Sequence, residues 1–174
     1  GSDSITLIEP SEMTLVVSNT NISCYGFGDG TILADADGGT PLLGIPPEYE
    51  YSFYNQSGTQ IDIETDVTSE TEELTPGIYT VIAKDMNECT VESGTVYISQ
   101  PGDSLTVSFS IQDATCAQNN GQASVFVFGG TLPYQYSWDN GQTGTNMIGL
   151  GSGYYPILIT DANNCIIRDS AFVI

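Results

Sequence analysis

The sequence contains the same series of motifs twice. The first series is Cys24, Gly38-Gly39-Thr40, Tyr49-Glu50-Tyr51-Ser52-Phe53, Gly77-Ile78-Tyr79 and Asp85-Met86-Asn87-Glu88-Cys89. The second is Cys116, Gly129-Gly130-Thr131, Tyr134-Gln135-Tyr136-Ser137-Trp138, Gly153-Tyr154-Tyr155 and Asp161-Ala162-Asn163-Asn164-Cys165. The order is the same in both copies, and 12 residues separate the glycine of the fourth motif from the final cysteine in each. Repetition at a period of roughly 70–90 residues predicts an array of small domains rather than one catalytic body.

Apolar and polar residues alternate with a period of two, and no stretch shows the periodicity of an amphipathic helix. In the second copy this pattern predicts strands at about 105–111, 122–128, 134–138, 144–149, 154–160 and 165–173. Six or seven short strands separated by regular turns are typical of an immunoglobulin-type sandwich. We therefore predict an all-β fold of tandem immunoglobulin-like antiparallel β-sandwich domains, each stapled by one disulfide.

The predicted boundaries follow the copies. Residues 1–13 are interpreted as a cloning scar, Gly1-Ser2, and the tail strand of a preceding repeat, because Ile5–Pro10 resembles Val96–Pro101. Residues 14–101 form the first repeat and residues 102–174 the second. We expect the chain to be a piece of a longer array.

Glycine, asparagine and aspartate mark the expected turns. Asn140-Gly141 predicts a tight hairpin, in which both turn positions need positive φ. Asp85–Cys89 and Asp161–Cys165 are expected to form turns, because Asp and Asn bond their own backbone and tolerate left-handed conformations. The first copy is longer than the second at 41–48, where it contains Pro41, Pro46 and Pro47, and again between Phe53 and Leu74, where the chain is acidic.

Four cysteines allow three disulfide pairings. Because each copy holds two of them at matching places, we expect Cys24 to pair with Cys89 and Cys116 with Cys165. Such bonds would imply an oxidising, extracytoplasmic setting. The alternatives are free thiols or a metal site, although the chain has neither histidine nor a CxxC motif.

The net charge of −20 comes from 22 acidic residues against Lys84 and Arg168 alone. Residues 14–103 contain fifteen acids and one base, whereas residues 104–174 contain four acids and one base. A surface this poor in cations excludes nucleic acid and anionic membranes as partners. No apolar run is long enough to cross a bilayer, so membrane insertion is not expected either.

Aromatic residues alternate on one strand of each copy. Tyr134, Tyr136 and Trp138 share a face, as do Tyr49, Tyr51 and Phe53. One interpretation is a platform for sugars, with Tyr49, Tyr51 and Tyr54 as possible glycan contacts. The other is the inner face of a core strand whose large aromatic packs on the disulfide. Because both copies keep the pattern, the core interpretation is favoured.

Acidic residues also alternate in the first copy. Asp62, Glu64 and Asp66 would share a strand face about 7 Å apart, and a calcium ion would relieve their repulsion. Asp29, Asp35 and Asp37 form a weaker cluster. The alternative is a solvated edge whose charges prevent edge-to-edge pairing. No EF-hand or nonapeptide calcium motif is present.

Catalysis has few candidate groups. Without histidine the chain cannot build a Ser-His-Asp or Cys-His site or a histidine-ligated zinc site. Paired carboxylates could in principle hydrolyse glycosides, but the acids lie on one exposed segment without a counterpart in the second copy. We expect neither enzymatic activity nor a cofactor other than possible calcium.

The motifs together resemble the SprB repeat of giant cell-surface adhesins from gliding Bacteroidetes. The resemblance rests on Asp29-Gly30-Thr31-Ile32, Pro133–Trp138, Asn140-Gly141, the two Asp-x-Asn-x-Cys motifs and the closing Gln100-Pro101. The first copy departs from it at 41–48 and has Phe53 where tryptophan is typical. The resemblance covers nearly the whole chain.

The resemblance implies an extracellular protein, exported by a type IX secretion route and moved along the outer surface by the gliding machinery. Its partners would be surfaces or polysaccharides, together with neighbouring repeats of the same chain. We expect a filament and contact surface in adhesion and gliding motility. A carbohydrate-binding module with its site on the first copy's insertion is the alternative, and a calcium-stiffened linker is a third possibility.

Overall fold

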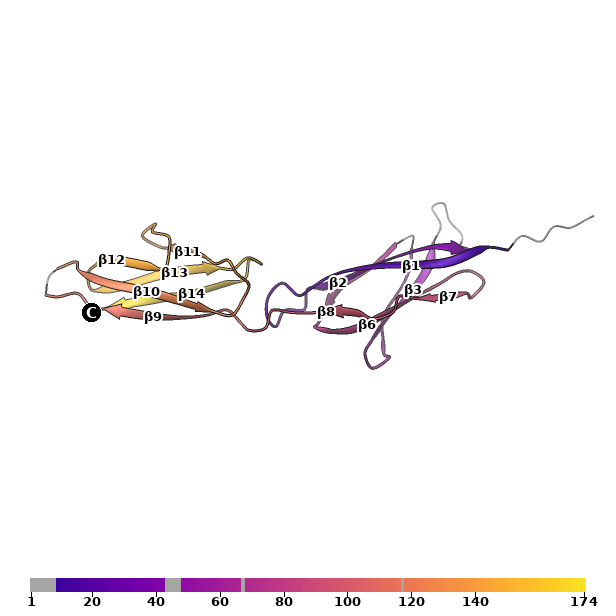
Figure 1. The fold of residues 1–174 in the computed structure, drawn as a ribbon, viewed down its shortest axis with the longest axis horizontal. Coiled ribbons are helices and arrows are strands. Elements are labelled where there is room, and N and C mark those ends of the chain that lie inside the picture. Colours follow the sequence, from indigo (N-terminus) through magenta and orange to yellow (C-terminus); the bar gives the residue numbers. More distant parts are fainter. Residues whose placement is uncertain (1–8, 43–47, 67, 117) are drawn as a thin grey trace, which may run out of the picture. The chain divides into compact units, whose positions relative to one another are not determined.

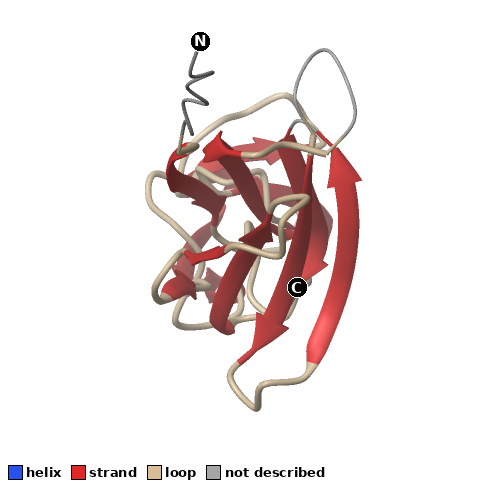
Figure 2. Ribbon diagram, turned by 90° about the vertical axis from the view of Figure 1, so that its right-hand side faces the viewer, coloured by secondary structure: helices blue, strands red, loops and turns tan. Residues whose placement is uncertain are grey.

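The computed structural model describes residues 9–42, 48–66, 68–116 and 118–174, and every regular element within them is a strand (Figure 2). These residues form two compact units. Unit 1 contains the described residues up to Ile22 and those from Gly28 to Ser99. Unit 2 contains Gln100–Ile174 and also the loop Ser23–Phe27. The predicted all-β class is confirmed.

Unit 1 is built from two antiparallel sheets. Its strands are β1 (Ser11–Thr20), β2 (Gly30–Gly39), β3 (Tyr49–Asn55), β4 (Gln60–Asp66), β5 (Thr68–Leu74), β6 (Gly77–Lys84), β7 (Thr90–Glu92) and β8 (Val96–Ile98). One sheet has the order β1-β2-β5, and the other has the order β4-β3-β6-β7, with β8 also pairing with β6 (Figure 1). The alternating residues of β2, β3 and β6 are buried and form the core of this unit.

Unit 2 repeats this plan with fewer strands. They are β9 (Thr106–Gln112), β10 (Gly121–Phe128), β11 (Gln135–Trp138), β12 (Asn146–Leu150), β13 (Gly153–Thr160) and β14 (Ile166–Val173). The sheets have the orders β12-β10-β9 and β11-β13-β14. The core contains Trp138, whose ring lies 6.2 Å from that of Phe109. All six strands predicted for this copy are confirmed, each within two residues.

Strand β4 has no counterpart in the described part of unit 2. It pairs with β3 in a hairpin, and the side chain of Asn55 closes the turn by accepting hydrogen bonds from the amides of Ser57 and Thr59. The extra length of the first copy after Phe53 therefore forms an added edge strand. The other insertion, at 41–48, lies mostly outside the described residues.

The predicted hairpin at Asn140-Gly141 is wrong. A local turn does form, in which the amide of Gly141 donates to the carbonyl of Trp138. Only Gly141 of these two residues has positive φ, and the strands on either side lie in different sheets, because β11 pairs with β13 and β12 with β10. The turn carries the chain from one sheet to the other.

The double glycines Gly38-Gly39 and Gly129-Gly130 bend the chain at the end of β2 and after β10. All four residues have positive φ, between 61° and 83°. A Cβ atom on Gly38 would lie 2.1 Å from the carbonyl oxygen of Glu12, and one on Gly129 would lie 2.0 Å from that of Ser104. A side chain is therefore excluded by both conformation and space.

The predicted boundaries at residues 13 and 101 stay predictions. The tail strand expected before residue 13 falls mainly on residues 1–8, outside the described part of the chain, and β1 begins at Ser11. Its three-residue overlap with the expected tail follows from pairing between Ser11 and Gly39.

Candidate functional site: a disulfide clasp

The Asp-x-Asn-x-Cys motif of unit 2 forms a turn organised by one carboxylate. Asp161 is 2% exposed, and its Oδ1 accepts hydrogen bonds from the amides of Asn163 and Cys165, both at 2.9 Å. Its Oδ2 accepts a hydrogen bond of 2.8 Å from the amide of Thr131. The adjacent residue Asn164 adopts the left-handed conformation with φ 65°. The carboxylate thus fixes Cys165 against the chain that follows the double glycine.

Unit 1 contains the same turn with the same contacts. Asp85 accepts hydrogen bonds from the amides of Asn87 and Cys89 at 2.9 Å and from that of Thr40 at 2.8 Å. Glu88 has φ 64°. The predicted turns are confirmed, and the sequence equivalence of the two copies extends to individual atoms.

The bonds that Asp85 accepts also change its acidity. The hydrogen bond from the Thr40 amide, helped by those from Cys89 and Asn87, lowers the pKa of Asp85 from its ordinary value of 3.8. These amides stabilise the charged carboxylate, so the turn is strongest when Asp85 is ionised.

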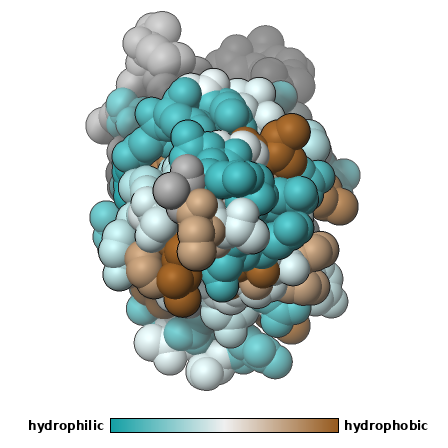
Figure 3. Space-filling view, turned by 90° about the vertical axis from the view of Figure 1, so that its left-hand side faces the viewer, coloured by the Kyte–Doolittle hydropathy of each residue, from teal (hydrophilic) through white to brown (hydrophobic). Residues whose placement is uncertain are grey.

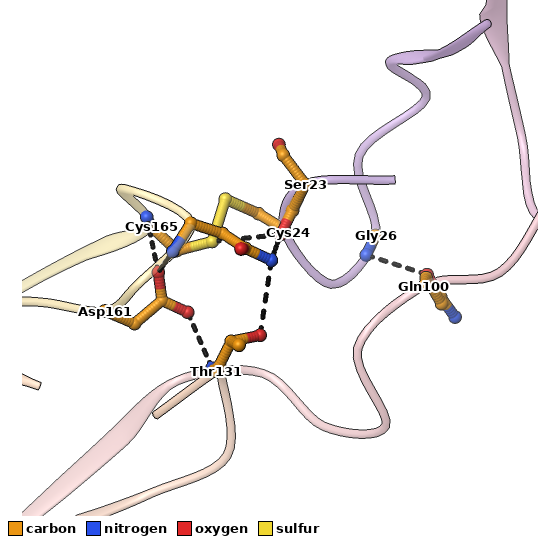
Figure 4. Close-up of a disulfide and its surroundings, with 8 residues drawn as sticks. Ser23, Cys24, Gly26, Gln100, Thr131, Asp161 and Cys165 are labelled. Carbon is orange, nitrogen blue, oxygen red and sulfur yellow. Dashed lines mark hydrogen bonds between the residues drawn. A yellow bond between two sulfur atoms is a disulfide. The ribbon is translucent and has the colours of Figure 1, made fainter. Parts of the chain in front are cut away.

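A loop covers the turn of unit 2 and is bonded to it covalently. Cys24 and Cys165 form a disulfide with a Cα–Cα distance of 5.7 Å (Figure 4). Beside it, the Nδ2 of Asn163 donates to the carbonyl oxygen of Ser23 at 2.9 Å. The amide of Gly26 donates to the Oε1 of Gln100 at 3.1 Å. We call this set of contacts, between the loop Ser23–Phe27 and unit 2, the clasp.

A pocket of about 390 Å³ lies beneath the loop. Tyr25 and Phe27 contribute to its wall, together with Leu105, Ile166 and Ile167. Although 48% and 57% exposed, these two rings add apolar contact to the covalent bond and the two hydrogen bonds. The loop is therefore held on unit 2 by non-covalent contacts as well as by the covalent disulfide.

The predicted pairings Cys24–Cys89 and Cys116–Cys165 are wrong. Cys24 pairs with Cys165, while Cys89 and Cys116 are free and exposed. Cys24 precedes the start of β2, whereas Cys89 is hydrogen-bonded to Asp85, which in turn accepts a hydrogen bond from Thr40, just beyond the end of β2. A strand of ten residues is about 30 Å long, and a disulfide needs Cα atoms roughly 4–7 Å apart. Strand β14 separates the second predicted pair in the same way, because Cys165 precedes it and Ile174, at its far end, bonds Asp113 and Ala114.

The aromatic residues of β3 lie in the core. Tyr49, Tyr51 and Phe53 are at most 1% exposed. The hydroxyl of Tyr49 donates to the carbonyl of Gly38, and that of Tyr51 accepts from the amide of Ala36. Burial, the largest cause, raises the pKa of both tyrosines.

The burial of these rings decides between the two interpretations of the aromatic pattern. The favoured core interpretation holds, except that Trp138 packs on Phe109 and not on a disulfide. Of the three possible glycan contacts, only Tyr54 is partly exposed. The rings of Tyr49 and Tyr51 are not available to a sugar.

The acidic residues predicted to share a face do so on β4. Asp62, Glu64 and Asp66 lie opposite Phe53, Tyr51 and Tyr49 in the β3–β4 register. Glu64 accepts a hydrogen bond from the buried hydroxyl of Ser69. Strand β4 is at the edge of its sheet, the position expected for charges that prevent edge-to-edge pairing. Among the described residues, no three His, Cys, Asp or Glu side chains are grouped so that they could hold a metal ion.

Part of each copy matches a known sequence family. The SprB repeat family model matches residues 16–58 and 108–143. One segment in each copy of the chain therefore matches the SprB repeat family that the motifs resemble. Each matched segment contains the first cysteine, the double glycine and the aromatic strand of its copy. The Asp-x-Asn-x-Cys turns at 85–89 and 161–165 lie beyond the matched segments, so the clasp joins a cysteine within a match to one outside it.

Solved structures of low sequence identity are similar to this chain, and one of them, at a TM-score of 0.50, shares its fold. A C-terminal 282-residue fragment of intimin, solved with the intimin-binding domain of its translocated receptor, is 15% identical with a TM-score of 0.50, covering 94% of this chain and 64% of its own. The three N-terminal domains of the bacteriophage RB49 Hoc protein are 16% identical with a TM-score of 0.48, covering 94% and 59%. The chain thus spans less than two thirds of either. Fibronectin(III)-like modules of Clostridium thermocellum CbhA are 15% identical with a TM-score of 0.38, covering 91% and 94%.

Two further comparisons gave negative findings. No curated protein matched the chain by sequence. A search of the described residues found no helix with the length and apolar character needed to cross a membrane.

Proposed function

We propose that this chain is a segment of a repetitive extracellular adhesin. It serves as a stalk and as a contact surface in cell-surface adhesion and gliding motility. The family match and the immunoglobulin-like fold support an extracellular repeat domain. The disulfide supports an oxidising, extracytoplasmic location, because such bonds are rare where thiols are kept reduced.

The observation that carries the stalk role is the position of the disulfide in the chain. It joins residues that are 141 positions apart, so residues 25–164 lie within a covalent ring. Tension applied to the two ends passes through residues 1–24, the disulfide and residues 165–174. Unfolding inside the ring cannot lengthen the chain, which suits a load-bearing filament.

The charge distribution supports the same role. Many acids of unit 1, among them Asp35, Asp37 and Glu70, are exposed on strand faces, and those of β4 lie at a sheet edge, where they repel similar surfaces and maintain solubility. The end of the chain shown in Figure 3 is mostly hydrophilic, with separate small hydrophobic areas. We propose a role in contact and extension without enzymatic activity or a resident cofactor.

The carbohydrate-binding alternative is left with Tyr54 as a candidate contact, because the other two candidates, Tyr49 and Tyr51, are buried. Calcium binding at Asp62, Glu64 and Asp66 stays a prediction. It is tested by comparing the melting temperature in EDTA and in millimolar Ca²⁺ at fixed ionic strength. An unchanged melting temperature would count against a calcium-stiffened linker.

Adhesion is tested by retention of the whole chain on glass, agarose, chitin and a panel of polysaccharides, with and without Ca²⁺, at low and high salt. Saturable retention on one material that survives high salt supports a contact surface. The reduced and unfolded chain, with the same charge, is the control for non-specific adsorption. Absence of saturable retention on every material would leave this segment a stalk only.

A further inference from the structure

The turn of unit 1 has the residues that receive the loop in unit 2, but no loop covers it in the described part of the chain. Six residues of unit 2 contact the loop or position the residues that do, and their counterparts in unit 1 are of the same or similar type. Gln100, Gly130, Thr131, Asp161, Asn163 and Cys165 correspond to Glu9, Gly39, Thr40, Asp85, Asn87 and Cys89. We call this set of residues in unit 1 the open half-site.

The open half-site has the geometry of the clasped one. In unit 2 the Nδ2 of Asn163 donates both to the hydroxyl of Thr131 and to the carbonyl of Ser23. In unit 1 the Nδ2 of Asn87 donates to the hydroxyl of Thr40 at 2.9 Å. Because a side-chain amide carries two N–H groups, Asn87 can donate once more, as Asn163 does.

A pocket lies beside each turn at the same place. The pocket of unit 1 has a volume of about 420 Å³. Met13, Gly39, Cys89 and Val91 occupy the positions taken in unit 2 by Leu105, Gly130, Cys165 and Ile167. The difference is the wall that Cys24, Tyr25 and Phe27 provide in unit 2. Correspondingly, Cys89 is exposed whereas Cys165 is partly covered.

The other free thiol occupies the same place in its copy as the cysteine of the loop. Cys116 follows Thr115 and precedes strand β10, just as Cys24 follows Ser23 and precedes the equivalent strand β2. It is exposed. The chain therefore has a second cysteine placed like Cys24 of the loop, which is Cys116. It also has a second cysteine placed like Cys165 of the turn, which is Cys89.

We propose that Cys89 and Cys116 are complementary halves of further clasps, so that the Cys116 loop of one repeat docks on the open half-site of another. In a solution of this chain the occupant is a second copy. The carbonyl oxygen of Thr115 accepts a hydrogen bond from Asn87, and the sulfur of Cys116 bonds to that of Cys89. A pair joined in this way still has a free Cys116 on one copy and a free Cys89 on the other, so further copies can add head to tail into open chains.

The bond forms by thiol–disulfide exchange with a low-molecular-weight disulfide such as oxidised glutathione. The thiolate of one cysteine attacks the reagent, giving a mixed disulfide and one glutathione thiolate. The thiolate of the second cysteine then displaces the other glutathione. One oxidised glutathione is reduced to two thiols for each disulfide made.

The test uses two full-length variants, Cys116→Ser and Cys89→Ser, each with one free thiol and an intact clasp. They are mixed in equal amounts in a glutathione redox buffer, with one variant labelled with ¹⁵N so that intact mass separates the heterodimer from the homodimers. Random pairing of equally reactive thiols gives as much heterodimer as both homodimers together. Docking should raise this ratio by about tenfold or more, since a modest docking free energy gives such a factor.

Asn87→Ala in the Cys116→Ser chain should return the ratio toward the random value. Its matched control is Met86→Ala, which changes an exposed neighbour in the same turn. Reactivity of Cys89 toward a small disulfide reagent should be equal in both variants, which shows that the thiol itself is intact.

Two results would overturn the proposal: a random ratio in the unmodified pair, or peptide maps of the wild-type chain showing Cys89 bonded to Cys116 of the same molecule. The inference rests on the clasp and not on the adhesive role. Its failure would therefore leave the adhesion test unaffected, and a negative adhesion test would leave this proposal standing.

Discussion

The turns at Cys165 and Cys89 have the same internal geometry and different surroundings. In both, the aspartate accepts hydrogen bonds from three backbone amides. The residue just before the cysteine has positive φ, and the side-chain amide of the asparagine donates to the hydroxyl of a threonine. Only the turn of unit 2 is covered by the loop Ser23–Phe27. The comparison shows that the turn does not depend on the disulfide for its shape. It is a preformed surface that a suitable cysteine loop can bind.

The largest expected effect is mechanical. When the chain is stretched by its ends, reduction of Cys24–Cys165 should release the 140 residues enclosed by the bond. At about 3.4 Å per residue this adds roughly 480 Å of contour length. Single-molecule force spectroscopy with and without reductant measures it. Equal contour lengths with and without reductant would show that the disulfide does not carry the tension past residues 25–164.

Removing the clasp should destabilise unit 2, whereas removing the free thiol should not. We expect Cys165→Ser to lower the free energy of unfolding by about 2–4 kcal/mol. Cys89→Ser should change that of unit 1 by less than about 0.5 kcal/mol. Fluorescence of Trp138, the single tryptophan, reports on unit 2, and amide hydrogen exchange within β3 and β6 reports on unit 1. Equal losses in the two variants would contradict the asymmetry.

Alanine at the double glycine should damage both units alike, because this bend is common to the clasped and open turns. Gly129→Ala and Gly38→Ala each place a Cβ about 2 Å from a carbonyl oxygen in a left-handed conformation. We expect a loss of about 3 kcal/mol from each unit. Gly141→Ala is the control, with φ +83° but open space, and should cost about 1 kcal/mol. Thermal unfolding of the four proteins makes the comparison.

The open turn should weaken in acid. Because the pKa of Asp85 in the folded state is below 3.8, its carboxylate stabilises unit 1 above about pH 3.8, and this contribution is lost as the pH falls through the folded value. The difference in melting temperature between wild type and Asp85→Asn should therefore be largest near neutral pH and shrink below pH 3.8. Asp139→Asn, at an exposed position, serves as control. A difference that is constant with pH would refute this assignment.

The smallest effect concerns the ion pair that unit 2 lacks. Lys84 lies 2.7 Å from Glu50 and 3.7 Å from Glu88, whereas the sequence equivalents of Lys84 and Glu50 in unit 2 are Thr160 and Gln135. The double change Lys84→Thr with Glu50→Gln should shift the melting temperature of unit 1 by about 2 °C, because ion pairs at a partly solvated surface contribute little. The shift should disappear at high salt. A large shift that persists in salt would mean that the pair is more than a surface contact.

Local chemistry in the sequence predicted most of the fold. Alternation along Gly121–Phe128 and Gly153–Thr160 predicted strands, because a period of two places apolar residues on one face. Asp161 and Asn164 predicted a turn, since their side chains bond the backbone or tolerate left-handed φ. The buried rings of β3 were predicted as core from their repetition in both copies.

The candidate site was only half predicted. The sequence identified Cys24 and Cys165 as disulfide partners but assigned each to the wrong cysteine, because equal spacing in two copies suggests pairing within a copy. Spacing along the chain does not show that a ten-residue strand separates Cys24 from Cys89. The roles of Asn163 and Gln100 were missed, since a polar side chain in a turn or connector gives no sign of what it will contact.

The sequence by itself determined the two copies, their strands, their bends and the chemistry of each turn, because these depend on residues close together in the chain. The tertiary structure decided which sheet each strand joins and which cysteines meet. Those depend on distances between ends of strands, and a distance across a folded unit is set by the packing of all its strands rather than by any one segment.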